Sequence, residues 1–450
     1  MLFLKKIFSV FRNIHFQSLM GNGIMAGFGM LTFALLYRVL PEDVGVYLFF
    51  VTVLNLTDTL RSGLLTTSFI KFYSGTAKER AHEVAGSAWL IGLLITGVAG
   101  IISIAGFIIF RHSENKGLVL FFKYFPLIFL VTLPSFMANI AVQGDKRFDR
   151  LLWLRFINQV LFVLAILILY VAKKATAETV VIAYILSNLI TSIIIFCLRW
   201  TMIRAVKRAT RTTSREIFNF GKFSVGTGIS ANLFNVINTF IINSYLGPTG
   251  LAIYNLGGKL IQVIEMPLLS FAASGMPTLA AHYNNDKKQD VIYVTKKMIG
   301  MLTTCMLPVT LISLIFAEPI IGLLGGEAYI HTEAPNLFRI FMCVALLYPV
   351  DRFLALTLDV IHMPKVNFYK VLVVLAVNII ICLTAIHFFP SVYTIVLSGI
   401  LPTFLSIAIS YRFLTKYMSF NFWNIYGVGA KETLSFLKGL RAKFFTEKKN

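Results

Sequence analysis

Long runs of apolar residues follow one another along the whole chain, separated by short polar or basic segments. Runs such as LFVLAILILYVA and VLVVLAVNIIICLTAIHFF are apolar on every side of a helix, and about 20 such residues cross a membrane. The short alternating segments of a membrane β-barrel do not fit this pattern. The sequence therefore predicts an all-α integral membrane protein. Its twelve predicted spans are residues 16–38, 43–72, 83–110, 118–143, 150–172, 177–199, 218–246, 250–281, 291–316, 334–361, 366–389 and 391–415.

The basic residues predict the orientation of these spans. If the N-terminus lies in the cytoplasm and the spans alternate, most Lys and Arg residues, Arg155 and Lys370 among them, fall on the cytoplasmic side. Cytoplasmic loops collect positive charge in this way. We therefore expect a multi-pass protein of the inner (cytoplasmic) membrane with both termini in the cytoplasm. The bias also accounts for the net charge of +21, so we expect no nucleic-acid partner.

Two similar stretches, VLPEDVGVYLF and LGPTGLAIYNL, occur in the two halves of the chain. Pro41 and Pro248 lie 207 positions apart, and so do Tyr47 and Tyr254. The stretches fall between spans one and two and between spans seven and eight, which indicates an internal duplication. Because six helices is an even number, the two copies should share one orientation and be related by a pseudo-twofold axis along the membrane normal.

The duplication and the most basic loop predict the domain organisation. The expected domains are an N-terminal six-helix lobe at 1–205 and a C-terminal six-helix lobe at 206–415. Residues 416–450 should form a basic, amphipathic cytoplasmic tail at the inner leaflet.

Ionisable residues inside three of the predicted spans are the candidate functional residues, since charges at bilayer depth are costly and usually face protein or water. Asp58 and Arg61 are three residues apart and close enough to pair on one helix face. The candidate substrate-binding cations are Arg61, Lys259 and Arg352. The candidate coupling or cavity-tuning groups are Asp58, Glu265, Asp351, Asp359, Asn55 and Gln262.

Two interpretations of these charges remain open. The cations could line a central polar cavity between the halves and bind an anionic headgroup. Each ion pair could instead be a structural clasp between packed helices. At the 207-residue offset Asn55 corresponds to Gln262 and Asp58 to Glu265, so each half places an amide and an acid on one helix face.

The sequence contains no motif of an enzyme or a metal site. It has no HExxH pair and no Walker loop, and its four Cys residues form no CxxC pair. No segment between the spans is long enough for a soluble catalytic domain. We therefore expect no enzymatic activity, no metal site and no cofactor.

Several short motifs resemble a known family. In the first half these are the LPEDVGVY turn, Asp58 followed by Gly63 and Leu64, and the IKF at the end of span two. In the second half FGK, LGP, YN and the Lys259–Leu260 pair match more closely. The pattern resembles the polysaccharide and O-antigen flippases of the multidrug/oligosaccharidyl-lipid/polysaccharide (MOP) exporter superfamily. The chain departs from that pattern in the spacing after Asp58 and in Lys71, where the family usually has Arg.

The resemblance implies a two-lobed, MATE-like bundle that works by alternating access. The implied function is a flippase that moves a polyprenyl-diphosphate-linked oligosaccharide from the inner to the outer leaflet for surface polysaccharide biosynthesis. The implied partners are this lipid-linked oligosaccharide, membrane lipids, and a polysaccharide polymerase with other glycan-assembly proteins, and coupling to a proton or sodium gradient is usual in the superfamily. The alternative is a MATE-like drug or small-molecule exporter, for which an acidic cavity is expected.

Overall fold

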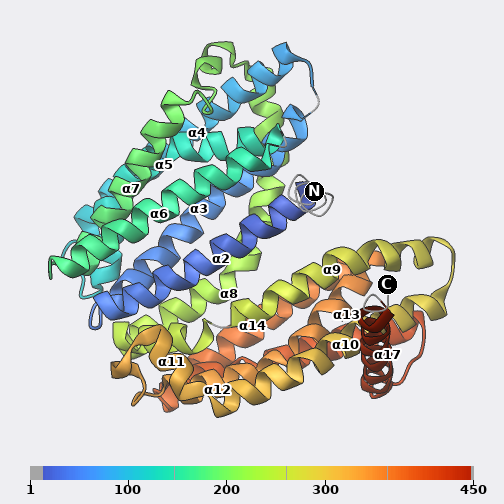
Figure 1. Ribbon diagram of the computed structural model, residues 1–450. Coiled ribbons are helices and arrows are strands. Elements are labelled where there is room, and N and C mark those ends of the chain that lie inside the picture. Colours follow the sequence, from blue (N-terminus) through green and yellow to red (C-terminus); the bar gives the residue numbers. More distant parts are fainter. Residues whose placement is uncertain (1–13, 75, 146, 260, 362, 447–450) are drawn as a thin grey trace. The chain divides into compact units, whose positions relative to one another are not determined.

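The computed structural model describes residues 14–74, 76–145, 147–259, 261–361 and 363–446. Within these ranges the regular structure consists of helices alone (Figure 1), so the prediction of an all-α protein is confirmed. By their internal contacts the residues form two compact units, Met1–Asn243 and Ser244–Asn450. The lobe boundary predicted at 205/206 and the separate tail at 416–450 stay predictions.

The first unit is a bundle of long helices. They are α2 (Ile14–Val39), α3 (Val44–Tyr73), α4 (Lys78–Phe110), α5 (Lys116–Gly144), α6 (Phe148–Val171), α7 (Ala177–Cys197), the short 3-10 helix η1 (Ile203–Arg208) and the first part of α8 (Arg211–Gly258). Local sequence fixes where two of them begin. The Asn115 side chain accepts from the backbone N–H of Leu118 at 3.1 Å, and Thr176 with Thr179 forms a capping box at the start of α7. Such caps satisfy N–H groups that have no partner inside the helix.

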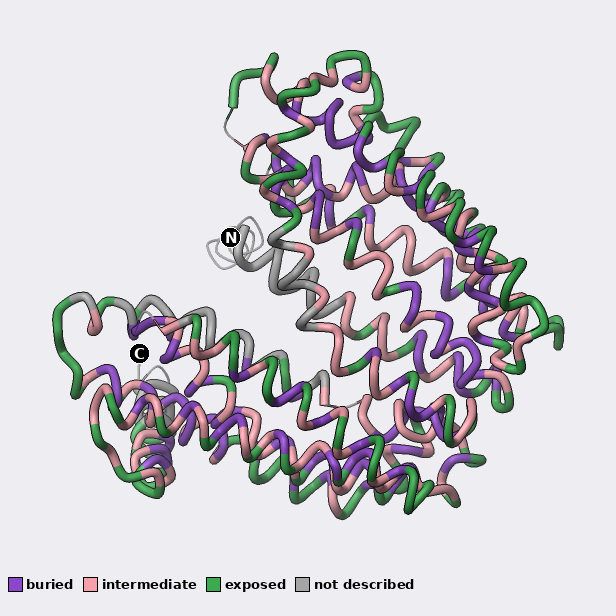
Figure 2. Tube along the Cα trace, turned by 180° about the vertical axis from the view of Figure 1, so that it is seen from behind, coloured by how far each residue is buried: buried purple, intermediate pink, exposed green. Residues whose placement is uncertain are grey.

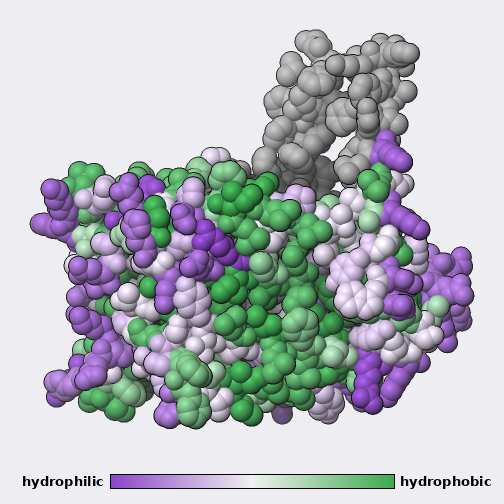
Figure 3. Space-filling model, turned by 90° about the horizontal axis from the view of Figure 1, so that it is seen from below, coloured by the Kyte–Doolittle hydropathy of each residue, from purple (hydrophilic) through white to green (hydrophobic). Residues whose placement is uncertain are grey.

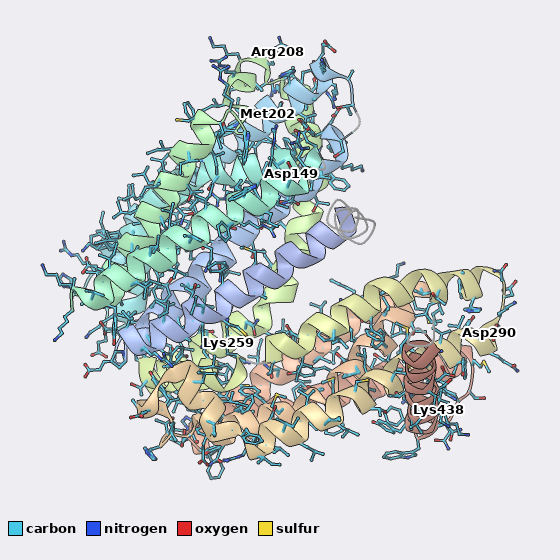
Figure 4. All side chains as sticks on the ribbon, viewed as in Figure 1. Asp149, Met202, Arg208, Lys259, Asp290 and Lys438 are labelled. Atoms are coloured by element: carbon cyan, nitrogen blue, oxygen red, sulfur yellow. The ribbon has the colours of Figure 1, made fainter. Side chains whose placement is uncertain are left out.

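The basic segment between α7 and α8 is anchored to α4. The indole N–H of Trp89 donates to the backbone O of Thr201 at 2.7 Å. A Cβ atom at Gly86 would lie 2.1 Å from the backbone O of Ala205, so only Gly permits this approach of η1 to α4. Arg208 lies at this end of the first unit (Figure 4). The segment that the sequence shows as the most basic loop is therefore a fixed part of the first unit.

The second unit contains the remaining helices. They are the end of α8, α9 (Ile261–Asn284), α10 (Lys288–Ile315), α11 (Ala317–Gly325), the 3-10 helix η2 (Glu327–Tyr329), α12 (Ala334–Ala345), α13 (Tyr348–Val360), α14 (Pro364–Phe388), α15 (Val392–Ser398), α16 (Ile400–Tyr417) and α17 (Asn424–Thr446). Phe353, Leu354 and Leu358 of α13 form the centre of a fully buried core. The helix α17 packs on α10 where Gly300 meets Gly429, with almost no space between the two backbones.

Three predicted spans differ in detail from the helices observed. The turn predicted at Pro248 is a kink inside α8, because Gly247 adopts a φ of +69° that residues other than Gly rarely adopt. The span predicted at 250–281 is interrupted, since α8 ends at Gly258 and α9 begins at Ile261. Two consecutive Gly residues at 257–258 weaken the helix there. Two more predicted spans are interrupted. The span at 334–361 is divided between α12 and α13, and the span at 391–415 between α15 and α16.

The outer surfaces of these helices suit a lipid environment. Among the described residues, nine helical segments are long and apolar enough to cross a membrane: α3, α4, α5, α6, α7, α10, α12 with α13, α14, and α15 with α16. Together with α2, α8 and α9 they correspond one by one to the twelve predicted spans. Large apolar side chains are exposed on them, such as Ile101 at 70% and Ile315 at 72%. Figure 2 shows that exposed residues recur along the helices of both units. Figure 3 shows hydrophobic side chains gathered in the middle of one face and hydrophilic ones toward its two ends. The chain is therefore a multi-pass membrane protein.

Candidate functional site

Three polar residues of α3 lie on one side of this helix, inside the first unit. Asn55, Asp58 and Arg61 are spaced three apart along the chain. The side chain of Arg61 is 5% exposed, whereas that of Asp58 is 41% exposed. Nε and Nη2 of Arg61 both donate to Oδ1 of Asp58, at 3.1 and 2.5 Å. The ion pair that the sequence spacing predicts is therefore present.

The helix α5 holds the other side of the Arg61 guanidinium. Nη1 of Arg61 donates to the backbone O of Phe129 at 3.3 Å and to Oγ1 of Thr132 at 3.2 Å. The rings of Phe129 and Phe136 lie 4.3 and 4.6 Å from the guanidinium carbon. A ring face attracts a cation by about 0.5–2 kcal/mol. Arg61 thus joins α3 to α5 through two neutral acceptors and two rings, while Asp58 binds it from α3 itself.

A cavity of about 290 Å³ lies beside this ion pair, and α2, α3, α5, α6 and α7 contribute to its wall. Most of the lining can form hydrogen bonds; the neutral polar residues are Asn55, Thr132, Ser135, Asn139, Asn158, Gln159, Tyr184, Asn188 and Thr191. Some of these side chains also join helices. Nδ2 of Asn158 donates to Oδ1 of Asn188 at 3.1 Å, and Nε2 of Gln159 donates to Oγ1 of Thr32 at 2.6 Å. The first unit therefore contains a polar cavity, called the chamber below, among helices whose outer surface is apolar.

Among the described residues, three charged ones line the chamber: Asp58, Arg61 and Arg155. Arg155 is half-buried on α6, and sequence reasoning missed it because it was counted with the cytoplasmic loop cations. The available signal was its position on the helix, since Arg155, Asn158 and Gln159 fall on one face of α6. The formal charge of the lining is positive, with two guanidinium groups and one carboxylate.

A second buried ion pair lies in the second unit. Nζ of Lys370, on α14, lies 3.5 Å from Oδ1 of Asp351 on α13 and donates to Oγ of Ser410 at 3.2 Å. Ser406 also donates to Oδ1 of Asp351. The Lys370 side chain is 3% exposed. Lys370 was also missed by the sequence analysis, for the same reason as Arg155.

Other predicted residues of the second unit interact electrostatically with this pair or with one another, Asp359 with Lys370 and Arg352, and Glu265 with Arg352. Asp359 accepts from Nδ2 of Asn367, at 3.1 and 3.2 Å to its two oxygens. Arg352 and Glu265 are exposed, on α13 and α9. Lys259 lies between α8 and α9 (Figure 4), where its backbone N–H donates to the O of Leu256 at 3.4 Å.

The side chain of Gln262 lies outside the described residues. The functional roles predicted for the nine candidate residues, including a cavity shared by the two halves, stay predictions.

A family described as polysaccharide biosynthesis protein matches residues 35–333. The chain belongs to this family. No curated protein matches the sequence. Membership in the polysaccharide biosynthesis family confirms the resemblance that the Pro-containing turns and the FGK and LGP motifs indicate.

Solved structures of transporters share the fold of this family member. A multidrug resistance MATE transporter of the MOP superfamily in an inward-facing conformation matches with a TM-score of 0.72 at 15% identity, over 88% of this chain and 96% of that one. The lipid II flippase MurJ, in an inward closed conformation, matches with a TM-score of 0.68 at 12% identity, over 92% and 90%.

A third similar structure is a MOP superfamily transporter from Pyrococcus furiosus, for which a binding pocket of reverse polarity is described as suggesting a different function. It matches with a TM-score of 0.58 at 14% identity, over 89% of this chain and 94% of that one. At these identities the likeness shows the fold alone, and the predicted MATE-like fold is confirmed.

Proposed function

We propose that this protein is a flippase that moves a polyprenyl-diphosphate-linked oligosaccharide from the inner to the outer leaflet of the cytoplasmic membrane by alternating access. The observation that supports this most directly is the polar chamber of the first unit, where half of the described lining residues carry an amide or a hydroxyl group. Sugar hydroxyls both donate and accept hydrogen bonds, and Asn, Gln, Ser and Thr side chains offer both functions. A chamber of this chemistry inside apolar helices suits a glycan that has to pass a bilayer.

The family supports the same cargo. Its description is polysaccharide biosynthesis, and surface polysaccharides are assembled from lipid-linked units that must change leaflet. One protein of similar fold is by name a flippase of a lipid, so this fold accommodates lipid-linked cargo. The proposal includes cytoplasmic termini, because the basic segments then lie on the cytoplasmic side.

The alternative, a MATE-like exporter of drugs or small molecules, is favoured by the likeness in fold to MATE transporters. A cationic drug requires an acid that is not already neutralised. The one acid among the described residues that line the chamber, Asp58, is bonded twice by Arg61, and Arg155 adds a further positive charge. The lining therefore favours a neutral or anionic cargo over a cationic one.

A substitution that fills the chamber tests the proposal. Ser135 of α5 lines the chamber, and Ser135→Phe should block it. Leu130 of the same helix is 56% exposed on the outer surface, so Leu130→Phe adds the same ring outside the chamber and is the matched control. Both variants are introduced into a strain lacking the native gene.

We expect Leu130→Phe to restore surface polysaccharide fully. Ser135→Phe should be present in the membrane at the same level, restore little polysaccharide, and leave lipid-linked oligosaccharide accumulated in the cell. Normal surface polysaccharide in the deletion strain, together with increased drug sensitivity, would instead identify an exporter.

A further inference from the structure

The helix α17 has one face packed on α10 and another face that is exposed. Ile425 and Gly429 are buried against α10, where the backbone of Gly429 meets that of Gly300. Glu432, the one acid in the sequence of α17, is on the same side, because it pairs with Lys297 of α10. The negative charge of α17 is therefore turned toward the protein.

The exposed face of α17 combines apolar side chains with positive charge. Trp423, which directly precedes the helix, is 74% exposed, and Leu434 is 58% exposed. At 3.6 residues per turn these two positions fall on one side of the helix, opposite Glu432. Lys431 and Lys438 are exposed beside them and have no carboxylate partner among the described residues. This face therefore suits an apolar surface with negative charge at its boundary.

The place where α17 crosses α10 corresponds to the surface of a membrane. Residues 298–315 of α10 contain no charged side chain and are about 27 Å long at 1.5 Å per residue, close to the bilayer core of about 30 Å. Lys296 and Lys297 directly precede this run, and Gly300, which contacts α17, lies within its first turn. Figure 1 shows α17 running across α10 and not along it. The helix therefore has the depth and the orientation of an interfacial helix.

The segment that leads into α17 is held in place at this level. The hydroxyl of Tyr411 on α16 donates to the backbone O of Phe420 at 2.7 Å, and Nζ of Lys296 lies 5.2 Å from the centre of the Phe420 ring. The backbone N–H of Trp423 donates to Oδ1 of Asn421 at 2.9 Å. Trp rings are enriched at the boundary between lipid and water, so an exposed Trp fixed at this depth is suited to the headgroup region.

We propose that the exposed face of α17 binds the bilayer surface and prefers anionic phospholipids, with Trp423 and Leu434 at the edge of the acyl chains. Lys431 and Lys438 then contact the headgroup phosphates. The sequence predicts only a basic tail at the inner leaflet, whereas the structure adds a helix fixed to α10 with its acid inward and its cations outward. Lys438 and Asp290, near the start of α10, lie at the same end of the second unit (Figure 4). The inference goes beyond the proposed function, since it does not depend on the cargo.

Hydrogen exchange of the purified full-length protein in nanodiscs tests the proposal. The nanodiscs contain phosphatidylcholine alone or phosphatidylcholine mixed with phosphatidylglycerol, which is anionic. One double variant, Lys431→Gln with Lys438→Gln, removes both charges, and a second, Lys431→Arg with Lys438→Arg, keeps them. The matched control is Lys173→Gln with Lys174→Gln, which removes two exposed charges from the loop between α6 and α7.

We expect α17 to exchange more slowly when phosphatidylglycerol is present, in the wild type, the Arg variant and the control alike. One basic residue near an anionic surface changes binding about five-fold, so the lipid effect should reach roughly 30-fold for two. The Gln variant should lose this effect. Salt at about 1 M should remove it as well, because the screening length falls to about 3 Å. Exchange of α10 should be the same in all variants, which shows that the contact at Gly300 is kept.

Equal exchange of wild-type α17 in the two kinds of nanodisc would overturn the proposal and identify the exposed face as a surface for a protein partner. A lipid effect that persists in the Gln variant would overturn it too. Trp423→Ser tests the apolar part separately: exchange of α17 should rise by the same factor in both nanodiscs, and an unchanged exchange would show that this face is not inserted. None of these outcomes depends on export, so they leave the proposed function to its own test.

Discussion

The unequal burial of Asp58 and Arg61 predicts that their two single substitutions have very different costs. The Arg61 side chain is 5% exposed and the Asp58 side chain 41%. Removal of the acid in Asp58→Ala leaves a buried guanidinium that cannot lose its proton. Breaking a fully buried pair costs about 3–5 kcal/mol of unfolding free energy, and we expect the lower end, about 3 kcal/mol, because the Asp58 side chain is 41% exposed and Arg61 keeps its bonds to Phe129 and Thr132.

Removal of the cation is expected to cost less. In Arg61→Met the remaining carboxylate of Asp58 faces the chamber and stays in contact with water. The protein loses hydrogen bonds to a charged group, worth about 1.5–3 kcal/mol, and regains part of this by burying the Met side chain. We expect a net loss of about 1–2 kcal/mol for Arg61→Met.

The double variant decides whether the pair acts as one unit. Replacement of a whole buried ion pair by apolar groups is often neutral or stabilising. Asp58→Ala with Arg61→Met should therefore be about 2 kcal/mol more stable than Asp58→Ala alone, so the second substitution rescues the first. The exposed pair Arg147–Asp149, with side chains 49% and 48% exposed, is the control, and its equivalent cycle should stay within about 1 kcal/mol.

Thermal unfolding of the purified variants in detergent measures these differences. In soluble domains of 150–250 residues, 1 kcal/mol moves the Tm by about 2–4 °C, so Asp58→Ala should melt on the order of 10 °C below the wild type. A double variant no more stable than Asp58→Ala, or an Arg61→Met more damaging than Asp58→Ala, would refute the argument. Export by a stable double variant would show that Arg61 is a clasp and not a cargo ligand.

Two further predictions concern the docking of α17 on α10. Gly300→Leu should displace α17, because a Cβ at Gly300 would lie 2.4 Å from the backbone O of Ile425; hydrogen exchange of α17 should rise, whereas in Gly427→Leu, where a Cβ meets nothing within 4 Å, it should not. The second concerns pH: the Lys297 ammonium, and then the Tyr293 hydroxyl at 2.5 Å, lower the pKa of the Glu432 carboxyl. Because this pKa is lowered, the contact of Glu432 stabilises the docking of α17 fully above the ordinary Glu pKa of about 4.3. The stabilisation is lost as the pH falls through the lowered pKa. Exchange of α17 should therefore rise in acid in the wild type and depend less on pH in Glu432→Gln, and an unchanged pH profile in that variant would contradict this.

The sequence predicted the helices well because a membrane span leaves a strong signal. The span predicted at 83–110 corresponds to α4 at Lys78–Phe110, and that at 177–199 to α7 at Ala177–Cys197. Apolar runs of this length have one structural solution in lipid. The break before Ile261 was not predictable from hydropathy, because Gly257 and Gly258 are compatible both with a continuous span and with an interruption.

The candidate site was predicted in part, and the omissions have a common cause. The Asp58–Arg61 pair follows from residue spacing on a single helix. Arg155 and Lys370 lie within the first three turns of α6 and α14. A count of loop charges includes cations this close to a helix start and places them in the cytoplasm. The partner of Lys370 is on another helix, and the chamber that Arg155 lines is formed by several helices. Only the packing of α6 against α2 and α7, and of α14 against α13 and α16, shows that these cations point into protein.

The internal duplication predicts equivalent charges in the two halves, and the described residues do not follow it. At the 207-residue offset Asp58 corresponds to Glu265, which is exposed, and Arg61 corresponds to Leu268, which is buried in an apolar core. The second unit has its buried pair elsewhere, with Lys370 closed in by an acid and a serine. The two halves therefore share their helices but not the positions of their ion pairs. This indicates that helix packing is kept in both halves, whereas the buried charges have a different role in each half. In the first unit the pair lies beside a chamber whose described lining carries one further cation, Arg155.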